Sequence, residues 1–246
     1  MRVELGWRAW VLVVGLIFAS VGVVAQDKPA KEDEASTPAV KKDNGNFLKR
    51  HEAFVARAKE GNVKVLFLGD SITAGWAGAG KEVWAQRYEK LPAANFGIGG
   101  DRTQHVLWRI THGELEGIHP QVVVLMLGTN NIKSDSAAAI AKADEKLVST
   151  IRQKLPGTKI LLLGIFPRAH KTDDPAMHIP EKVKAVNDQL ARLDDGKDVR
   201  YLDLADKLAP GGTLVPEYYT DNVHLTAKGY EVWADAIDAR LKEMMQ

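Results

Sequence analysis

Five positions, far apart in the chain, carry the residue types that acyl transfer requires. A serine becomes a nucleophile when a histidine accepts its proton, and a carboxylate can hold that histidine in the required tautomer. Backbone and amide N–H groups can stabilise the negative oxygen of a tetrahedral intermediate. The candidate nucleophile is Ser71, the candidate base and its orienting acid are His224 and Asp221, and the candidate oxyanion donors are Gly100 and Asn130, with Ser71 adding its own N–H.

Ser71 stands in the tripeptide Gly69-Asp70-Ser71, directly after the apolar run 65–68. In isolation, a serine at this place is better explained as a helix N-cap, and only the other motif positions favour a nucleophile. The α/β-hydrolase elbow Gly-x-Ser-x-Gly is excluded, because position 73 is Thr73. We expect Asp70 to cap or brace the neighbouring loops rather than to act as the orienting acid.

His224 is the strongest base candidate among the seven histidines. Asp221 lies three residues before it, so a single turn would bring the two side chains together. His105 falls in a predicted helix and is expected to be a packed, hydrogen-bonded residue. The remaining histidines lack a metal-ligand spacing such as His-Glu-x-x-His, so we expect no metal and no cofactor.

Alternating strand and helix patterns predict an α/β fold. Near-continuous apolar runs indicate strands that are covered on both faces, as in a parallel sheet. Helical stripes with spacings of three and four residues lie between them, and Thr226 is placed to cap the last helix. The expected strands are 63–68, 94–96, 122–127, 159–164 and 199–204.

This order of elements predicts a three-layer, doubly wound domain with a five-stranded parallel sheet in the order 2-1-3-4-5. Ligands bind beyond the carboxyl ends of such strands. The loop with Ser71 would then lie between the loops with Gly100 and Asn130, although these residues are about thirty positions apart. A dinucleotide fingerprint is excluded in the glycine-rich loop, because the third glycine position is occupied by Arg102.

Three segments are expected along the chain. Residues 1–25, with an apolar stretch ending in Val-Val-Ala, resemble a secretory signal peptide, the alternative being an uncleaved membrane anchor. Residues 26–45 are polar and charged and predict a flexible linker. A single domain should occupy residues 46–246, beginning with a helix that buries Phe47, Leu48, His51, Phe54, Val55 and Ala58.

Composition narrows the classes of partner and location. The net charge of +1 gives no reason to expect a nucleic-acid partner, so we expect none. The chain has no cysteine, so it has neither disulfides nor the acylated cysteine of a bacterial lipoprotein. We expect an exported protein, periplasmic or secreted, with no stable membrane insertion once the signal is removed.

The four motif positions together resemble the SGNH hydrolases, also called the GDSL esterase/lipase family. The blocks are Ser71, Gly100, Asn130 and Asp221-Asn222-Val223-His224, and the resemblance spans about residues 47–245. It is tightest over 95–109 and 128–131, where the chain is similar to the catalytic-subunit branch of platelet-activating-factor acetylhydrolase Ib. The third block reads Gly-Thr-Asn-Asn, where many members have Gly-x-Asn-Asp; the acetylhydrolase branch shares this asparagine.

The resemblance implies a flavodoxin-like sheet and a serine esterase that cleaves short acyl groups, notably acetyl, through an acyl-enzyme. The expected substrate is a small ester or an acetylated carbohydrate, because an export signal fits carbohydrate better than a phospholipid mediator. A lysophospholipase or thioesterase for longer chains, and a non-catalytic carbohydrate-binding protein, stay open. The branch forms dimers, so a homodimer is a candidate assembly. Expected substrate contacts are Ile72, Thr129, Arg168, Tyr218 and Tyr219, with loop packing as the alternative for the tyrosines.

Overall fold

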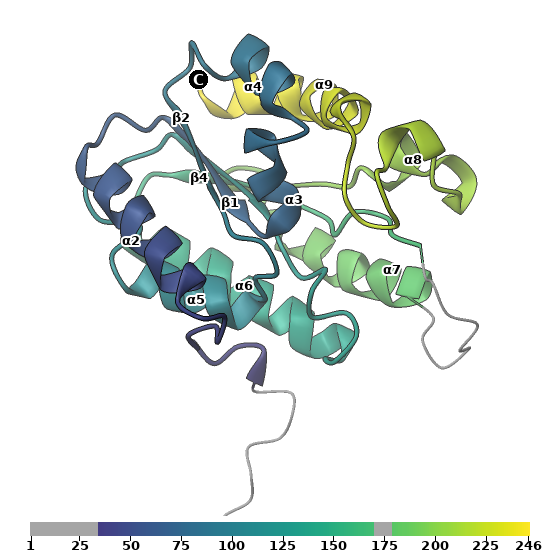
Figure 1. Cartoon of the computed structure of the whole chain (residues 1–246), viewed down its shortest axis with the longest axis horizontal. Coiled ribbons are helices and arrows are strands. Elements are labelled where there is room, and N and C mark those ends of the chain that lie inside the picture. The colour runs from purple at the N-terminus through teal and green to yellow at the C-terminus, as the bar shows by residue number, and fades with distance from the viewer. Residues whose placement is uncertain (1–33, 170–178) are drawn as a thin grey trace, which may run out of the picture.

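A five-stranded parallel sheet forms the centre of the computed structural model, which describes residues 34–169 and 179–246 (Figure 1). Its spatial order is β2-β1-β3-β4-β5, so the predicted order is confirmed. Each neighbouring pair of strands is parallel. The strands are β1 (Val65–Gly69), β2 (Ala93–Gly97), β3 (Val122–Met126), β4 (Lys159–Leu163) and β5 (Val199–Leu202).

Two hydrophobic cores form because the central strands are apolar on both faces. Successive side chains of a strand point to opposite faces of the sheet. In β1, Leu66 and Leu68 enter one core, whereas Val65 and Phe67 enter the other. All five residues of β1 and of β3 are buried, which is the pattern that predicted strands covered on both sides.

Helices cover both faces of the sheet and complete the three layers (Figure 1). The first core is closed by α2 (Asn46–Lys59), α5 (Thr103–Thr111), α6 (Ala137–Lys154) and α7 (Ile179–Leu190). The second core is closed by α3 (Ser71–Ala74), α4 (Lys81–Arg87), α8 (Ala205–Leu208) and α9 (Ala227–Met244). Short 3₁₀ turns are η1 (Gly75–Ala77), η3 (Ala191–Leu193), η4 (Pro210–Gly212) and η5 (Pro216–Tyr218).

Local signals set several of the element ends. Thr226 caps α9, since its hydroxyl accepts a hydrogen bond from Gly229 N at 3.2 Å, as predicted. Strand β1 begins at Val65 rather than at residue 63, although Val63 is itself buried in the core. The expected buried face of α2 holds for Phe47, His51 and Ala58, but Leu48 was placed wrongly and is 40% exposed.

Part of the expected linker lies against the domain. Ala35 is fully buried, and its carbonyl accepts a hydrogen bond from Thr103 Oγ1 at 2.8 Å. Ala39 N donates to Gln104 O at 3.0 Å. Composition alone predicted a tether here, but small residues need little apolar surface to pack closely against a helix.

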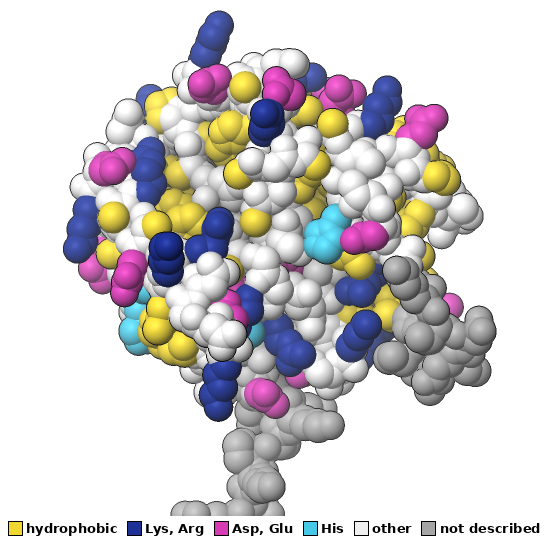
Figure 2. All heavy atoms as spheres, viewed as in Figure 1, with side chains coloured by type: hydrophobic (Ala, Val, Ile, Leu, Met, Phe, Trp, Pro, Cys, Tyr) yellow, Lys and Arg dark blue, Asp and Glu magenta, His cyan; other side chains and the backbone are white. Residues whose placement is uncertain are grey.

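The expected signal peptide and the first residues of the linker lie outside the described residues. Among the helices of residues 34–169 and 179–246, none is long and apolar enough to cross a membrane. Basic and acidic side chains are interspersed over the described surface drawn in Figure 2, in keeping with a net charge near zero.

Candidate active site

The carboxyl end of β1 delivers Ser71 to the start of α3. Asp70 is the N-cap of this helix, because its Oδ1 accepts a hydrogen bond from Ile72 N at 2.9 Å. The N-cap alternative for Ser71 is therefore wrong, and the expectation that Asp70 braces the turn is confirmed. As a first-turn amide, Ser71 N–H has no acceptor within its own helix and can serve a ligand oxygen.

Ser71, His224 and Asp221 form a continuous chain of hydrogen bonds. Ser71 Oγ lies 2.9 Å from His224 Nε2, and His224 Nδ1 lies 2.8 Å from Asp221 Oδ2. These are the distances at which an imidazole can take a hydroxyl proton while a carboxylate fixes its tautomer. About half of each side chain is exposed, at 45% for His224 and 46% for Asp221.

Asp221 is held as an anion by its own loop. Its Oδ1 accepts hydrogen bonds from Val223 N at 2.7 Å and from His224 N at 2.8 Å. Partial burial raises the pKa of Asp221, but the hydrogen bonds from the side chain and backbone of His224 and from Val223 outweigh burial and lower the pKa to about 2. The carboxylate is therefore ready to stabilise a protonated imidazole throughout the neutral range.

Gly100 occupies a tight turn beside the serine. Asp101 N donates to Ile98 O at 3.2 Å, which closes a four-residue turn with Gly99 and Gly100 at its centre. Gly100 has a φ of +73°, the left-handed conformation that the third residue of a type II turn needs and that glycine adopts without strain. A Cβ at Gly99 would lie 3.9 Å from the Ser71 Cβ, so this turn lies against the serine.

Asn130 joins the loop after β3 to the same turn. Its Nδ2 donates to Asp101 O at 2.8 Å and contacts Asp70 Oδ2 at 3.3 Å. The second contact is long for a hydrogen bond. The N–H group that makes this contact is therefore the one that could bind a stronger acceptor instead. The structure thus brings together the loops with Ser71, Gly100 and Asn130, as the strand order predicted.

Asp70 is a buried carboxyl next to the serine. Burial raises the pKa of Asp70 to about 7; the charge of Asp101 adds to this rise, whereas the Ile72 backbone hydrogen bond, His224 and Arg168 oppose it. Near neutral pH Asp70 therefore gains or loses its negative charge, at a distance of 3.3 Å from Asn130 Nδ2.

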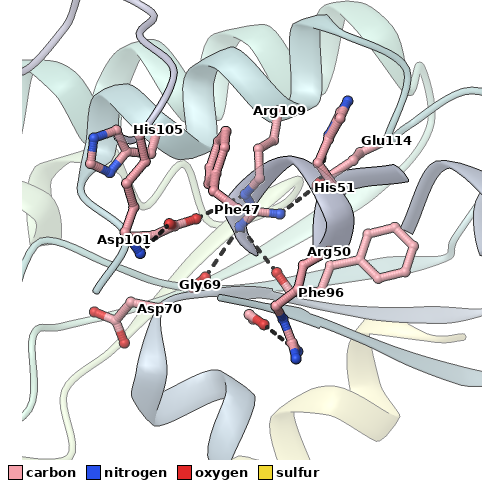
Figure 3. A network of polar contacts seen from close by, with 12 residues as sticks. Phe47, Arg50, His51, Gly69, Asp70, Phe96, Asp101, His105, Arg109 and Glu114 are labelled. Carbon is pink, nitrogen blue, oxygen red and sulfur yellow. Dashed lines mark hydrogen bonds and ion pairs between the residues drawn. The ribbon is translucent and has the colours of Figure 1, made fainter. Parts of the chain in front are cut away.

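A buried charged network centred on Arg109 connects Asp101, at the end of the glycine turn, with Gly69, Phe96 and Glu114 (Figure 3). Arg109 is fully buried in α5 and donates to Asp101 Oδ2 at 2.9 Å, to Phe96 O at 3.1 Å and to Gly69 O at 3.3 Å. It also pairs with Glu114, which contacts His51 Nδ1 at 3.0 Å. One guanidinium therefore binds the ends of β1 and β2 together with the turn between β2 and α5.

Sequence reasoning missed Arg109. The available signal was a charged residue on the apolar face of a predicted helix, between Leu107 and Ile110, which are both buried. A fully buried arginine is rare unless its donors are all partnered, so this pattern favours a structural pairing role.

The expected substrate contacts fall into two groups. Ile72 and Thr129 are each 1% exposed, so their side chains lie in the interior, and a contact with substrate stays a prediction. Tyr219 is also buried and donates from its hydroxyl to Pro167 O at 3.0 Å, which is the packing alternative. Tyr218 is half-buried and stays a prediction.

Arg168 lies between the site and a separate cavity. Its Nη1 donates to Thr129 O at 2.8 Å and to Thr129 Oγ1 at 3.2 Å, so it steadies the loop that carries Asn130. It also lines a cavity of about 610 Å³ together with Pro167, Asp203 and Leu214. Its role in substrate binding stays a prediction.

Two further expectations concern histidines and metals. His105 Nδ1 accepts a hydrogen bond from Arg102 N at 3.0 Å. The His105 ring also packs edge to face against Phe47, with ring centroids 6.0 Å apart, so it is the packed residue that was expected. Within residues 34–169 and 179–246, no group of three or more His, Asp or Glu side chains is arranged to hold a metal ion.

Comparisons with known proteins agree with this geometry. The model of the GDSL-like Lipase/Acylhydrolase family matches residues 67–232. Platelet-activating factor acetylhydrolase IB subunit alpha1 of Homo sapiens is 33% identical over 224 residues, which cover 87% of this chain and 92% of that protein. Subunit alpha2 of Rattus norvegicus is 36% identical over 187 residues, which cover 75% and 78% of the two chains.

A solved structure has the same fold. The GDSL-like lipase of Bacteroides thetaiotaomicron superposes with a TM-score of 0.65 at 18% identity, covering 81% of this chain and 98% of that one. The resemblance that rested on four motif positions is thereby confirmed over most of the domain. The chain belongs to the GDSL-like lipase/acylhydrolase family, whose members are hydrolases that act on esters.

Proposed function

We propose that the protein is a serine esterase that hydrolyses small O-acyl esters, with acetyl esters preferred. The observation that carries this proposal is the hydrogen-bonded chain from Ser71 Oγ through His224 to Asp221. A binding protein would have no need for a nucleophile, a base and an orienting acid in this order.

Acylation begins when Ser71 Oγ attacks the ester carbonyl carbon and His224 Nε2 takes the hydroxyl proton. Asp221 stabilises the imidazolium that forms. The oxyanion receives N–H groups from Ser71, Gly100 and Asn130. The intermediate then collapses, the alkoxide leaves with the proton from His224, and the acyl group stays on Ser71.

Deacylation repeats these steps with water as the nucleophile. His224 removes a proton from water, the hydroxide attacks the acyl-enzyme carbonyl, and the same donors hold the second oxyanion. Collapse releases the carboxylic acid, and His224 returns the proton to Ser71 Oγ.

Two observations support the preferred substrate. The relatives at 33–36% identity are named acetylhydrolases, which supports a small acyl group. About half of the His224 and Asp221 side chains is exposed, so the alcohol part of the ester can remain outside the protein. We propose that this alcohol part is a carbohydrate, so that the substrate is an acetylated carbohydrate. A phospholipid is the competing class of substrate, which the relatives' names support.

The test is the hydrolysis of nitrophenyl esters from acetyl to decanoyl. Ser71→Ala and His224→Ala should each reduce kcat by about 10³-fold or more, because the nucleophile and the base act as a unit. Ser149→Ala and His119→Ala change exposed residues of the same types and should leave kcat unchanged.

Several results would count against the proposal. If no ester is hydrolysed and a serine-directed phosphonate does not label the protein, the esterase function is wrong. A rate maximum at eight carbons or more would overturn only the acetyl preference. Acetylated xylan, acetylated sialic acid and a lysophospholipid should then be compared, since faster release of acid from the lipid would exclude the carbohydrate.

A further inference from the structure

Residues 35–43, here called the strap, run across the glycine turn before the chain enters α2. Besides the contacts of Ala35 and Ala39 with α5, Asp43 Oδ1 accepts a hydrogen bond from Phe47 N at 2.8 Å. The strap is thus bonded to α5 through Ala35 and Ala39, and to the first turn of α2 through Asp43.

Lys41 is the residue of the strap that reaches the turn. Its Nζ donates a hydrogen bond to Gly99 O and lies 3.6 Å from Asp101 Oδ1. It also lies 3.3 Å from the position that a Cβ would take at Gly100. The side chain is only 18% exposed, so most of it lies against the protein rather than in solvent.

The carbonyl that Lys41 binds belongs to the same peptide unit as Gly100 N–H. A trans peptide is planar, and its C=O and N–H point in opposite directions. A hydrogen bond that fixes Gly99 O therefore also fixes the direction of Gly100 N–H, away from Lys41. The central peptide of a glycine–glycine turn can otherwise rotate at low cost, because neither residue has a Cβ to resist rotation.

Asp101 connects this contact to the second oxyanion donor. Its Oδ2 is bonded to Arg109, whereas its buried Oδ1 has no hydrogen-bond partner and faces Lys41. The carbonyl of Asp101 accepts the hydrogen bond of Asn130. Two cations thus hold the turn, Arg109 from the protein interior and Lys41 from the strap.

We propose that Lys41 is a positioning residue, which locks the Gly99–Gly100 peptide in the orientation that presents Gly100 N–H to the oxyanion. This inference rests on the proposed esterase function. Since the oxyanion exists only in the transition state and the intermediate, loss of Lys41 should reduce kcat and leave KM nearly unchanged.

The experiment compares Lys41→Met, Lys41→Gln and Lys41→Arg in the full chain, with nitrophenyl acetate as substrate. Lys42→Met is the matched control, because Lys42 is the exposed neighbour. Removal of one oxyanion donor costs about 10²–10³ in kcat, so a donor that is present but free to rotate should cost about 10- to 100-fold. Lys41→Arg keeps a donor for Gly99 O and should recover most of the loss.

The outcomes separate this inference from the proposed function. If wild type is active, Ser71→Ala is inactive and Lys41→Met matches Lys42→Met in kcat, the positioning role is wrong and the esterase function stands. A change confined to KM or to the urea midpoint, or no recovery in Lys41→Arg, also overturns it. If Lys41→Met does not fold, Lys41→Gln decides by the same criteria. A wild type that is inactive on every ester removes both proposals.

Discussion

Asn130 has two partners, and the proposed function uses only one of its N–H groups. The bond to Asp101 O at 2.8 Å positions the amide, and the contact with Asp70 at 3.3 Å is weak enough to be exchanged for an oxyanion. The residue would therefore both hold the glycine turn and donate to the transition state.

We predict that Asn130→Ala lowers kcat for nitrophenyl acetate by about 10²–10³-fold, the usual cost of one oxyanion donor. Asn130→Asp keeps the shape but replaces the donor with a carboxylate near Asp70, so it should be at least as slow. Steady-state kinetics on both variants provide the measurement. An aspartate variant with wild-type kcat would show that Asn130 gives no hydrogen bond to the oxyanion.

At the scale of elements, the end of β2 touches α3, the helix that starts with Ser71. A Cβ at Gly97 would lie 2.2 Å from Ala74 N, a backbone atom that cannot move without α3. The absence of a side chain at this position thus sets how closely the glycine turn approaches Ser71.

Gly97→Ala should therefore push β2 and α3 apart. We expect a loss of about 1–3 kcal/mol in the free energy of unfolding, the range for overpacked sites, together with a large drop in kcat. Urea unfolding and ester hydrolysis provide the two readouts. Gly99→Ala, whose Cβ would have only a 3.9 Å contact, serves as the stability control. Equal unfolding midpoints for the two variants would contradict this account.

The elements differ in how well the sequence predicts them. Strands β1, β3 and β4 were predictable because their apolar runs satisfy both faces of the sheet, and the Asp221–His224 block was predictable because its two members are neighbours. The strap was not, since its polar composition favours exposure and its contacts use backbone atoms and the side chains of Lys41 and Asp43. The role of Arg109 was missed for a related reason. Its hydrogen-bond partners come from four separate segments, and no residue spacing in the sequence indicates that these segments meet.

At the scale of the whole molecule, three buried aspartates among the described residues retain protons that the unfolded chain would release. Burial raises the pKa of Asp70 to about 7 and that of Asp101 to about 6. Burial, with a smaller contribution from Asp70, raises the pKa of Asp144 well above its usual range, and neither of its carboxyl oxygens has a hydrogen-bond partner. Because the folded state binds more protons between the unfolded value near 3.8 and these raised values, these groups make the protein less stable as pH rises through that range.

Asp144→Asn should remove one of these contributions without changing the side-chain shape. The stability gained by the variant over wild type should be smallest at pH 4, close to the unfolded value of 3.8, and should grow as pH rises toward 8, because only wild type then has to bury or protonate a carboxylate. Urea midpoints measured from pH 4 to pH 8 test this, with the exposed Asp206→Asn as control. A difference that stays constant over this range would show that Asp144 does not titrate in the folded protein as proposed.

The contact between Ser71 and His224 joins residues 153 positions apart, and Tyr230 adds a hydroxyl bond to Ile72 O at 2.6 Å over 158 positions. Both bonds depend on α9 docking against α3, whereas His224 and Asp221 pair within their own loop. Under the proposed function, a nascent chain therefore emerges from the ribosome with the Ser71 nucleophile long before the His224 base. It would stay inactive through most of its synthesis, because ester hydrolysis would need both residues in contact.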